Sequence, residues 1–231
     1  MFLCLTFIHI IHAEDMGIWQ ISTSKRQVAL TFDDGPKPGI TEAILKILRG
    51  YRMKATFFIV GKQAAQYPEL ILQIDKEGHE LANHSYTHPC LTNLSTENVI
   101  LEIKKTNEIL EKLTKKCPVF FRPPGGNFNA NILNVVQNMG MKTAFWSLNA
   151  QDYFHPNLIR QLSPEMPNSK LGETLEDSIA FFLKPGSIVL LHNGDAGTVA
   201  VLPNLLKRIQ EMGFHSVTLK ELENDVSTTK Y

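Results

Sequence analysis

The sequence predicts an α/β fold, a distorted (β/α) barrel of about seven parallel strands. Two observations lead to this prediction. Beyond Ile18, short apolar or β-branched runs alternate regularly with helix-like stretches. The chain has 231 residues, 43% of them hydrophobic, which is enough to bury one sizeable core. Strands that alternate with helices indicate a parallel sheet, and seven strands flanked by helices suit closure into a barrel.

Seven runs have the composition of buried strands. They cover residues 27–32, 54–61, 79–85, 119–124, 142–150, 187–193 and 214–219. Between them, helix-like patterns occupy residues 39–50, 64–78, 96–116, 131–140, 175–183 and 201–213. The clearest helix is 96–116, for which Ser95 is the expected N-cap. Its apolar face carries Val99, Ile103, Ile109, Leu110 and Leu113. Because the alternation continues throughout, we expect one domain over 18–231.

Two segments lie outside this alternation. Residues 1–17 contain an apolar run that is too short to span a bilayer and resembles the h-region of an export signal. The run lacks a basic segment before it, and Ile11 and His12 make a poor cleavage site before Ala13. We therefore expect an atypical export signal or an N-terminal extension. Export to the periplasm, the cell envelope or the medium is favoured over a cytoplasmic location. Residues 151–174 contain three prolines and predict a long loop.

Charge and cysteine content narrow the function classes. The chain has 23 basic and 23 acidic side chains, so it has no excess positive charge to favour nucleic acid. A neutral or weakly charged small substrate fits better. Cys4, Cys90 and Cys117 form no CxxC pair. We expect each of these cysteines to be buried and to pack as a small hydrophobic residue. Pairing of Cys90 with Cys117 stays open.

The stretch ALTFDDGP places two adjacent aspartates, Asp33 and Asp34, at the end of an apolar run. Burying two carboxylates side by side costs several kcal/mol unless a cation or hydrogen bonds compensate. Either the pair is solvated in a turn, for which Gly35 and Pro36 are suitable, or it faces a cation.

Polar residues also follow the ends of other predicted strands. These are His84 and His88 after the third, Arg122 after the fourth, Asp152 after the fifth and His192 after the sixth. In parallel α/β barrels, the reacting groups gather at these ends. Two histidines spaced as His-x3-His, with a carboxylate from another strand, can form a three-ligand metal site. One aspartate would then bind the metal, and the other would act chemically beside it.

Structural roles are the alternatives for each of these residues. A lone histidine is more often part of the core, and Arg122 could brace the turn at Pro123 and Pro124. Asp152 could end the fifth strand. Trp146 and Leu190 are expected to pack beneath the site.

Five segments in this order, TFDDGP, HSYTH, RPPGG, WSLNAQD and IVLLH, resemble the motifs of the polysaccharide deacetylase family of carbohydrate esterases. The resemblance extends from about Val28 to Leu222. It implies a distorted barrel, a divalent metal and hydrolysis of N-acetyl groups on amino sugars such as those of peptidoglycan or chitin. Zinc is the expected metal, with Co2+, Ni2+ or Mn2+ as alternatives. An N-acetylated glycan is the expected partner, and neither nucleic acid nor a membrane span is expected.

The resemblance also implies a role for each site residue. Asp33 would be the general base, held by Arg122, and His192 the general acid, oriented by Asp152. The metal ligands would be Asp34, His84 and His88. The substrate side would be lined by Pro124, Gly125, Trp146 and Leu190, with a backbone N–H near Gly125 facing the oxyanion.

Four positions depart from the family pattern. Gly125 stands in place of an aromatic residue, which removes one wall of the sugar site. Asn149 and Asn193 each stand where the family commonly has an aspartate, and Tyr153 stands where it commonly has a tryptophan. These changes affect the expected substrate shape more than the chemistry. Two other classes remain: a related amidohydrolase acting on a cyclic imide or ureide, and a non-catalytic glycan-binding or non-haem iron protein. Asp33 and His192 would have no function in the second class.

Overall fold

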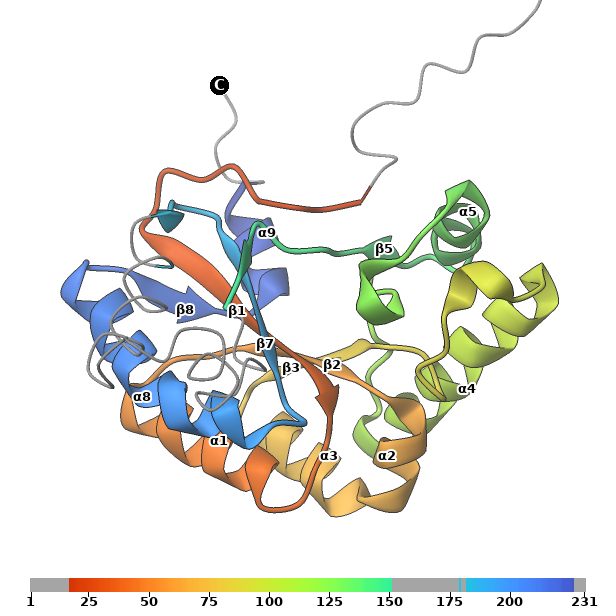
Figure 1. Ribbon diagram of the computed structural model, residues 1–231, viewed down its shortest axis with the longest axis horizontal. Helices are drawn as coiled ribbons and strands as arrows, with labels where there is room; N and C mark the ends of the chain where they lie inside the picture. The colour runs from red at the N-terminus through yellow and green to blue at the C-terminus, as the bar shows by residue number, and fades with distance from the viewer. Residues whose placement is uncertain (1–16, 151–178, 180–181, 227–231) are drawn as a thin grey trace, which may run out of the picture.

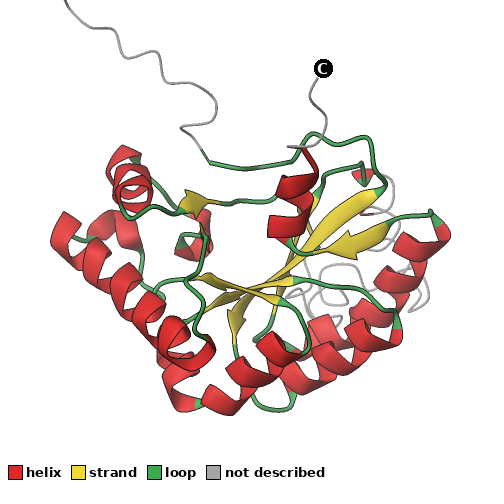
Figure 2. Cartoon of the chain, turned by 180° about the vertical axis from the view of Figure 1, so that it is seen from behind, coloured by secondary structure: helices red, strands yellow, loops and turns green. Residues whose placement is uncertain are grey.

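A computed structural model of the chain describes residues 17–150, 179 and 182–226. All strand pairs in the main sheet are parallel, and the strand order is β5-β4-β3-β2-β1-β7-β6, with β8 paired to β1. The sheet curls into a distorted half-barrel, and Figure 2 shows most of the helices along its outer side. The strands are β1 (Gln27–Gly35), β2 (Thr56–Ile59), β3 (Glu80–Asn83), β4 (Phe120–Phe121), β5 (Lys142–Thr143), β6 (Leu148–Asn149), β7 (Ile188–His192) and β8 (His215–Val217). All seven predicted runs therefore contain strands, and the predicted fold class is confirmed.

The fifth predicted run forms two strands rather than one. Its first part, β5, pairs with β4, whereas its second part, β6, pairs with β7 at the other end of the sheet. The chain between them thus crosses from one edge of the curled sheet to the other (Figure 1). Ile18 forms a β-bridge with Ala144, and Gln20 forms one with Ser187. The N-terminal segment therefore connects the chain that follows β5 with the chain that precedes β7.

The helices are α1 (Ile40–Gly50), α2 (Gly61–Gln66), α3 (Pro68–Lys76), α4 (Thr96–Thr114), α5 (Ala130–Asn138), α8 (Ala196–Glu211) and α9 (Leu219–Val226). Helix α9 differs from the outer helices, because its Leu219 and Leu222 belong to the cluster inside the half-barrel. Short 3-10 turns occur at η2 (Leu91–Asn93) and η3 (Pro124–Gly126). The predicted Ser95 N-cap is present, because its hydroxyl accepts a hydrogen bond from Asn98 N at 3.4 Å. Most of the helix predicted at 175–183, and the loop predicted at 151–174, lie outside the described residues.

Three helix predictions need correction. The predicted helix 64–78 is broken at Tyr67, because a residue that precedes proline avoids the helical conformation. Helix α8 begins at Ala196, five residues before its prediction, because Asp195 caps it by accepting a hydrogen bond from Gly197 N at 2.6 Å. Helix α9 was not predicted.

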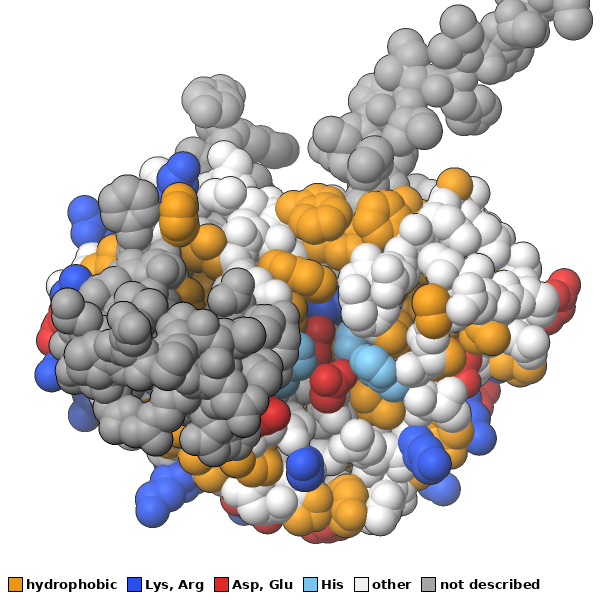
Figure 3. Space-filling view, viewed as in Figure 1, with side chains coloured by type: hydrophobic (Ala, Val, Ile, Leu, Met, Phe, Trp, Pro, Cys, Tyr) orange, Lys and Arg blue, Asp and Glu red, His pale blue; other side chains and the backbone are white. Residues whose placement is uncertain are grey.

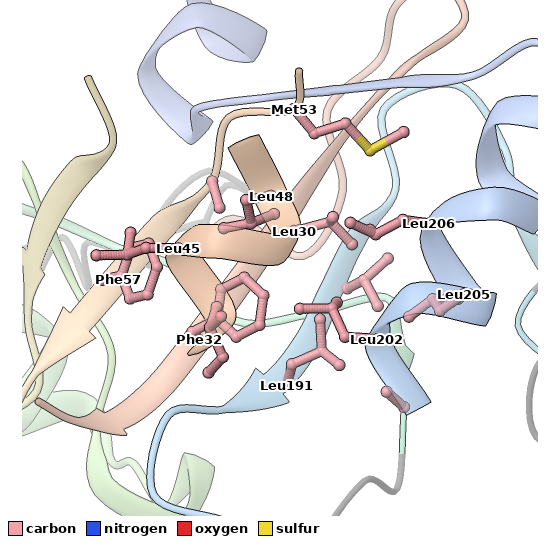
Figure 4. Packing of buried hydrophobic residues seen from close by; sticks show 14 of the residues in the cluster. Leu30, Phe32, Leu45, Leu48, Met53, Phe57, Leu191, Leu202, Leu205 and Leu206 are labelled. Atoms are coloured by element: carbon pink, nitrogen blue, oxygen red, sulfur yellow. The ribbon is translucent and has the colours of Figure 1, made fainter. Parts of the chain in front are cut away.

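The main core lies between the sheet and helices α1 and α8. Strand residues Leu30, Phe32 and Leu191 are fully buried and point toward leucines of both helices (Figure 4). A second cluster fills the inside of the half-barrel, where Ala29, Phe58 and Phe120 are buried. Because side chains alternate between the two faces of a strand, each strand is anchored on both sides and its C-terminal end is fixed in position.

The cysteine prediction was wrong for the two described cysteines. Cys90 and Cys117 are both exposed and unpaired rather than buried. Cys4 lies outside the described residues. None of the helices in the described part of the chain combines the length and apolarity needed to span a bilayer.

A glycine substitution tests the anchoring of the N-terminal segment. Gly186 has φ +80°, and a Cβ there would lie 1.5 Å from the carbonyl oxygen of Ile21. Gly140 has a similar φ of +73° but open space around it. We expect Gly140→Ala to cost about 1–2 kcal/mol, the cost of a left-handed alanine. Gly186→Ala should lower the free energy of unfolding by about 3 kcal/mol or more, because it adds a backbone clash. Urea denaturation measures both, and equal losses would contradict this anchoring.

Candidate active site

Six of the predicted site residues lie together at the C-terminal ends of strands β1, β3, β4 and β7. Asp33 and Asp34 belong to the end of β1, His84 and His88 follow β3, and Arg122 follows β4. His192 is the last residue of β7, where it pairs in register with Asp33. Parallel strand ends meet at one rim, so the topology itself collects these residues. Asp152 lies outside the described residues.

Arg122 is fully buried and holds Asp33 in place. Its Nη1 donates to Asp33 Oδ1 at 2.7 Å and to Thr31 Oγ1 at 2.9 Å. Its Nε and Nη2 donate to the carbonyl oxygens of Ala144 and Phe145, at 3.0 and 2.7 Å. The guanidinium also lies 3.9 Å from the centre of the Phe58 ring. Burial lowers the pKa of Arg122, and the adjacent carboxylate opposes that shift. Arg122 therefore fixes a carboxylate instead of bracing the proline turn.

Asp34, His84 and His88 form a group that could hold a metal ion. One ligand atom from each lies within 4.8 Å of the others. Asp34 Oδ1 lies 3.4 Å from His84 Nε2 and 3.1 Å from His88 Nε2. His84 Nδ1 lies 2.7 Å from the carbonyl oxygen of Arg122, so this ring nitrogen is the donor, and Nε2 is the nitrogen that faces Asp34. This arrangement matches that of metal-bound histidines, which donate their second N–H to a nearby acceptor.

The backbone around these ligands is strained. Asp34, Ser85 and His88 have φ of +71°, +66° and +60°, in the left-handed region that non-glycine residues rarely adopt. Such conformations persist where the surrounding contacts impose them, and they concentrate at functional sites.

Two residues that the sequence did not reveal fix the loop carrying both histidines. Glu102 on α4 accepts hydrogen bonds from the backbone N–H groups of Tyr86 and Thr87, at 2.8 and 2.7 Å. Asn83 accepts from Ser85 N at 2.7 Å and donates to the carbonyl oxygen of Ile103. Polar residues on an amphipathic helix are common, so no local signal could have marked Glu102.

Without a bound ion, the pKa values of Asp34 and His88 depend on the contacts between the side chains of this group. Burial alone would raise the pKa of Asp34, but hydrogen bonds with His84 and His88 lower it well below its usual value. The hydrogen bond to Asp34 raises the pKa of His88, against the opposing effect of burial. In the free protein, a proton on His88 therefore stabilises the carboxylate that a cation would also bind.

An open groove begins at this centre. Its volume is about 670 Å³, and its lining includes Asp34, His88 and His192 together with Lys37, Lys62, Gln63 and Tyr67. Figure 3 shows acidic and histidine side chains exposed in the middle of this face.

Leu190 is buried beneath the rim, as expected of a packing residue. Gly125 and Gly126 have φ of +63° and +70°, and the Trp146 ring lies so close to Gly126 that a Cβ there would meet it at 2.7 Å.

The family profile described as polysaccharide deacetylase matches residues 20–144, more than half of the chain. The chain belongs to the polysaccharide deacetylase family. A peptidoglycan-N-acetylglucosamine deacetylase of Bacillus cereus is 34% identical over 209 residues, which cover 88% of this chain and 91% of that protein. A chitooligosaccharide deacetylase of Rhizobium leguminosarum bv. trifolii is 34% identical over 175 residues, or 76% of this chain and 75% of that protein.

Solved structures of the family share the polysaccharide deacetylase fold of this chain. A peptidoglycan N-acetylglucosamine deacetylase, crystallised with an N-hydroxybenzamide, superposes with a TM-score of 0.79 and 30% identity, covering 90% of this chain and 92% of that one. A family 4 carbohydrate esterase pseudoenzyme from Bacillus anthracis has a TM-score of 0.77 and 26% identity, covering 90% and 69%. Because one of these proteins is a pseudoenzyme, the fold alone does not establish activity.

Proton competition at His88 gives a test of the metal group. Because the pKa of His88 is raised above 6.5, a bound cation must displace a proton at lower pH. We expect Zn2+ affinity to fall about tenfold for each pH unit below that pKa and to level off above it. Calorimetric titration in two buffers would measure the protons released. The exposed His215→Gln variant should behave as the wild type does, whereas His88→Ala should lose affinity. Affinity that does not change between pH 5.5 and 8 would contradict this site.

Proposed function

We propose that this chain is a metal-dependent hydrolase that removes N-acetyl groups from an amino-sugar glycan of the peptidoglycan or chitin type. The observation that carries the proposal is the convergence of Asp34, His84 and His88 beside the Arg122-paired Asp33. The relatives that act on peptidoglycan and on chitooligosaccharides support the substrate class.

Asp34, His84 and His88 would hold the divalent ion, through one carboxylate oxygen and two imidazole nitrogens. Two nitrogens and one oxygen with open positions suit Zn2+, with Co2+, Ni2+ or Mn2+ as alternatives. When bound, the ion would polarise the acetyl carbonyl group and lower the pKa of the attacking water. The N-hydroxybenzamide bound by the related deacetylase is a hydroxamate, a chelating group, which supports a metal site in the family.

Asp33 would act as the general base. Arg122 occupies its Oδ1, so Oδ2 is the oxygen left to accept a proton from water. Oδ2 lies 3.7 Å from His84 Nε2, beside the ligand group. Because Arg122 is fully buried and makes four hydrogen bonds, Asp33 is held at one position while it accepts the proton.

His192 would act as the general acid. It lines the same groove as Asp34 and His88, and its strand pairs with β1 at Asp33. A protonated imidazole there can deliver a proton to the departing amine nitrogen, with Asp152 expected to orient it. A backbone N–H near Gly125 would stabilise the oxyanion. The hydroxyl groups of the sugar would bind the polar groove side chains, including Lys37, Lys62 and Gln63.

The open groove and the Asp33–Arg122 pair also favour this function over the two alternative classes. A cyclic imide or ureide would favour a closed pocket, whereas the groove beside Asp34 and His192 is open. A purely glycan-binding protein would give no function to the Asp33–Arg122 pair. Peptidoglycan lies outside the cytoplasmic membrane, so the proposal also favours export.

Acetate release from a panel of N-acetylated glycans tests the function. The panel contains peptidoglycan, chitin-type oligomers and a cyclic ureide, and the protein is first loaded with a stoichiometric divalent ion. We expect acetate from at least one glycan, its loss after chelation, and no turnover of the ureide. Absence of acetate from every glycan with the fully loaded protein would contradict the proposal.

Exchanging each aspartate for asparagine separates the roles of Asp33 and Asp34. Asp33→Asn should keep the metal but lower acetate release by about 10²–10⁴-fold, because an amide cannot accept the proton. Asp34→Asn should weaken metal binding itself. Metal analysis and acetate assays on both variants measure this, with circular dichroism to check folding, since Asp33→Asn leaves Arg122 unpaired. The reverse pattern would show that the two roles were assigned backwards.

Removing His192 tests the acid. His192→Ala should keep the metal and lose turnover of an N-acetyl glycan by hundreds of times or more. Asp152→Asn should lower turnover by the same route, so the two losses should be non-additive. An activated acetate ester, whose leaving group needs no proton, should be affected less than the amide. Equal losses on ester and amide would instead indicate a structural role for His192.

A further inference from the structure

Three aromatic residues form a compact platform beside the active site. Trp19 stacks on Phe145, with ring centres 4.2 Å apart and planes 11° from parallel. Phe128 meets both rings, at 6.4 Å from Trp19 and 4.8 Å from Phe145. Phe145 is fully buried, yet Trp19 keeps 43% of its surface exposed although one face of its ring is covered. We call these three residues the aromatic platform.

The backbone that carries Trp19 is held on both sides. Ile18 N donates to Thr143 O at 2.8 Å, and Phe145 N donates to Ile18 O at 2.7 Å. On the other side, Ile21 N donates to Gly186 O at 3.0 Å. The indole therefore lies on a fixed, strand-like segment. Because this segment is already ordered, it would lose little conformational entropy when a ligand binds the indole.

The platform adjoins the catalytic centre through Phe145. The carbonyl oxygen of Phe145 accepts a hydrogen bond from Arg122, which in turn holds Asp33. Phe128 follows the Gly125–Gly126 turn that lies against Trp146. Figure 3 shows hydrophobic side chains gathered directly above the acidic and histidine side chains, on the same face. The Lys37 and Gln63 groove leaves the same centre along other residues, none of which belongs to the platform.

The chemistry of the platform suits a sugar ring. The C–H faces of a pyranose are apolar and flat, and they stack on aromatic rings, while the hydroxyl groups around the edge stay hydrated. A rigid, half-exposed tryptophan offers this surface, since one part of it is apolar and the rest meets water. One exposed indole is too small for a stable protein interface, which buries about 800 Å² on each partner.

We propose that Trp19 is a sugar-stacking subsite for a ring of the glycan chain that neighbours the N-acetylated ring under attack. This inference rests on the proposed function. The glycan would extend from the polar groove, across the centre of Asp34, His84 and His88, to the aromatic platform. An aromatic wall contributed by the N-terminal segment would then take the place of the aromatic residue expected at Gly125. The enzyme would favour long oligomers over short ones.

Kinetics on substrates with one sugar ring and with six test the subsite. Trp19→Ala should raise KM for an N-acetylglucosamine hexamer about fivefold or more and leave kcat nearly unchanged. The N-acetylglucosamine monomer and an aryl acetate ester should be affected little, because they have no second sugar ring to stack on Trp19. Trp19→Phe should restore much of the loss. Leu72→Ala, which alters a similarly exposed apolar residue on α3, is the control and should change nothing.

A binding measurement separates this inference from the proposed function. The chain has two tryptophans, Trp19 and Trp146, so intrinsic fluorescence can report hexamer binding without turnover. We expect a fluorescence change on titration of the metal-loaded wild type, and a weaker affinity in Trp19→Ala. Acetate release with identical hexamer KM and affinity in wild type and Trp19→Ala would overturn the subsite alone. Trp19-dependent binding without acetate release would overturn the proposed function and support the subsite. Loss of both binding and release in the wild type would overturn both.

Discussion

The buried ion pair between Arg122 and Asp33 is the interaction on which the rest of the site depends. A fully buried guanidinium is costly, and this one is stabilised by a carboxylate, a hydroxyl and two backbone carbonyl oxygens. The four partners come from two parts of the curled sheet: Thr31 and Asp33 belong to β1, and Ala144 and Phe145 lie in the crossing between β5 and β6. The pair therefore ties the two sides of the half-barrel together. It also distinguishes Asp33 from Asp34, which points instead toward His84 and His88.

The same arrangement links fold to chemistry through the backbone. The carbonyl oxygen of Arg122 meets His84 Nδ1, so the residue that fixes Asp33 with its side chain also orients a candidate ligand with its main chain. Glu102 and Asn83 hold the strained loop from His84 to His88. A single residue after β4 thereby couples the expected base to the expected metal group, and a shift in one would be felt by the other.

The placement of polar residues at the ends of predicted strands explains how much of the site could be predicted from the sequence. Residues such as Asp34 and His192 lie at the ends of buried strands, and parallel topology brings such ends to one rim. The splitting of residues 142–150 could not be predicted, because apolar alternation marks a strand and not its neighbours. Nothing local marked Glu102 as a loop anchor, nor Trp19 as part of an aromatic platform, since both depend on contacts between segments distant in the sequence. Exposed Cys90 shows that residue type alone is a weak guide to burial.

The most direct test of this account is the Arg122→Lys variant, examined for metal content and acetate release together. Lysine keeps the positive charge near Asp33 but cannot reproduce the planar fork that reaches four acceptors. The account predicts a folded protein with unchanged metal stoichiometry, since His84 contacts the backbone of residue 122, and acetate release reduced at least about tenfold. Undiminished acetate release, or loss of metal in parallel with activity in a folded protein, would contradict the claim that Arg122 acts by positioning Asp33.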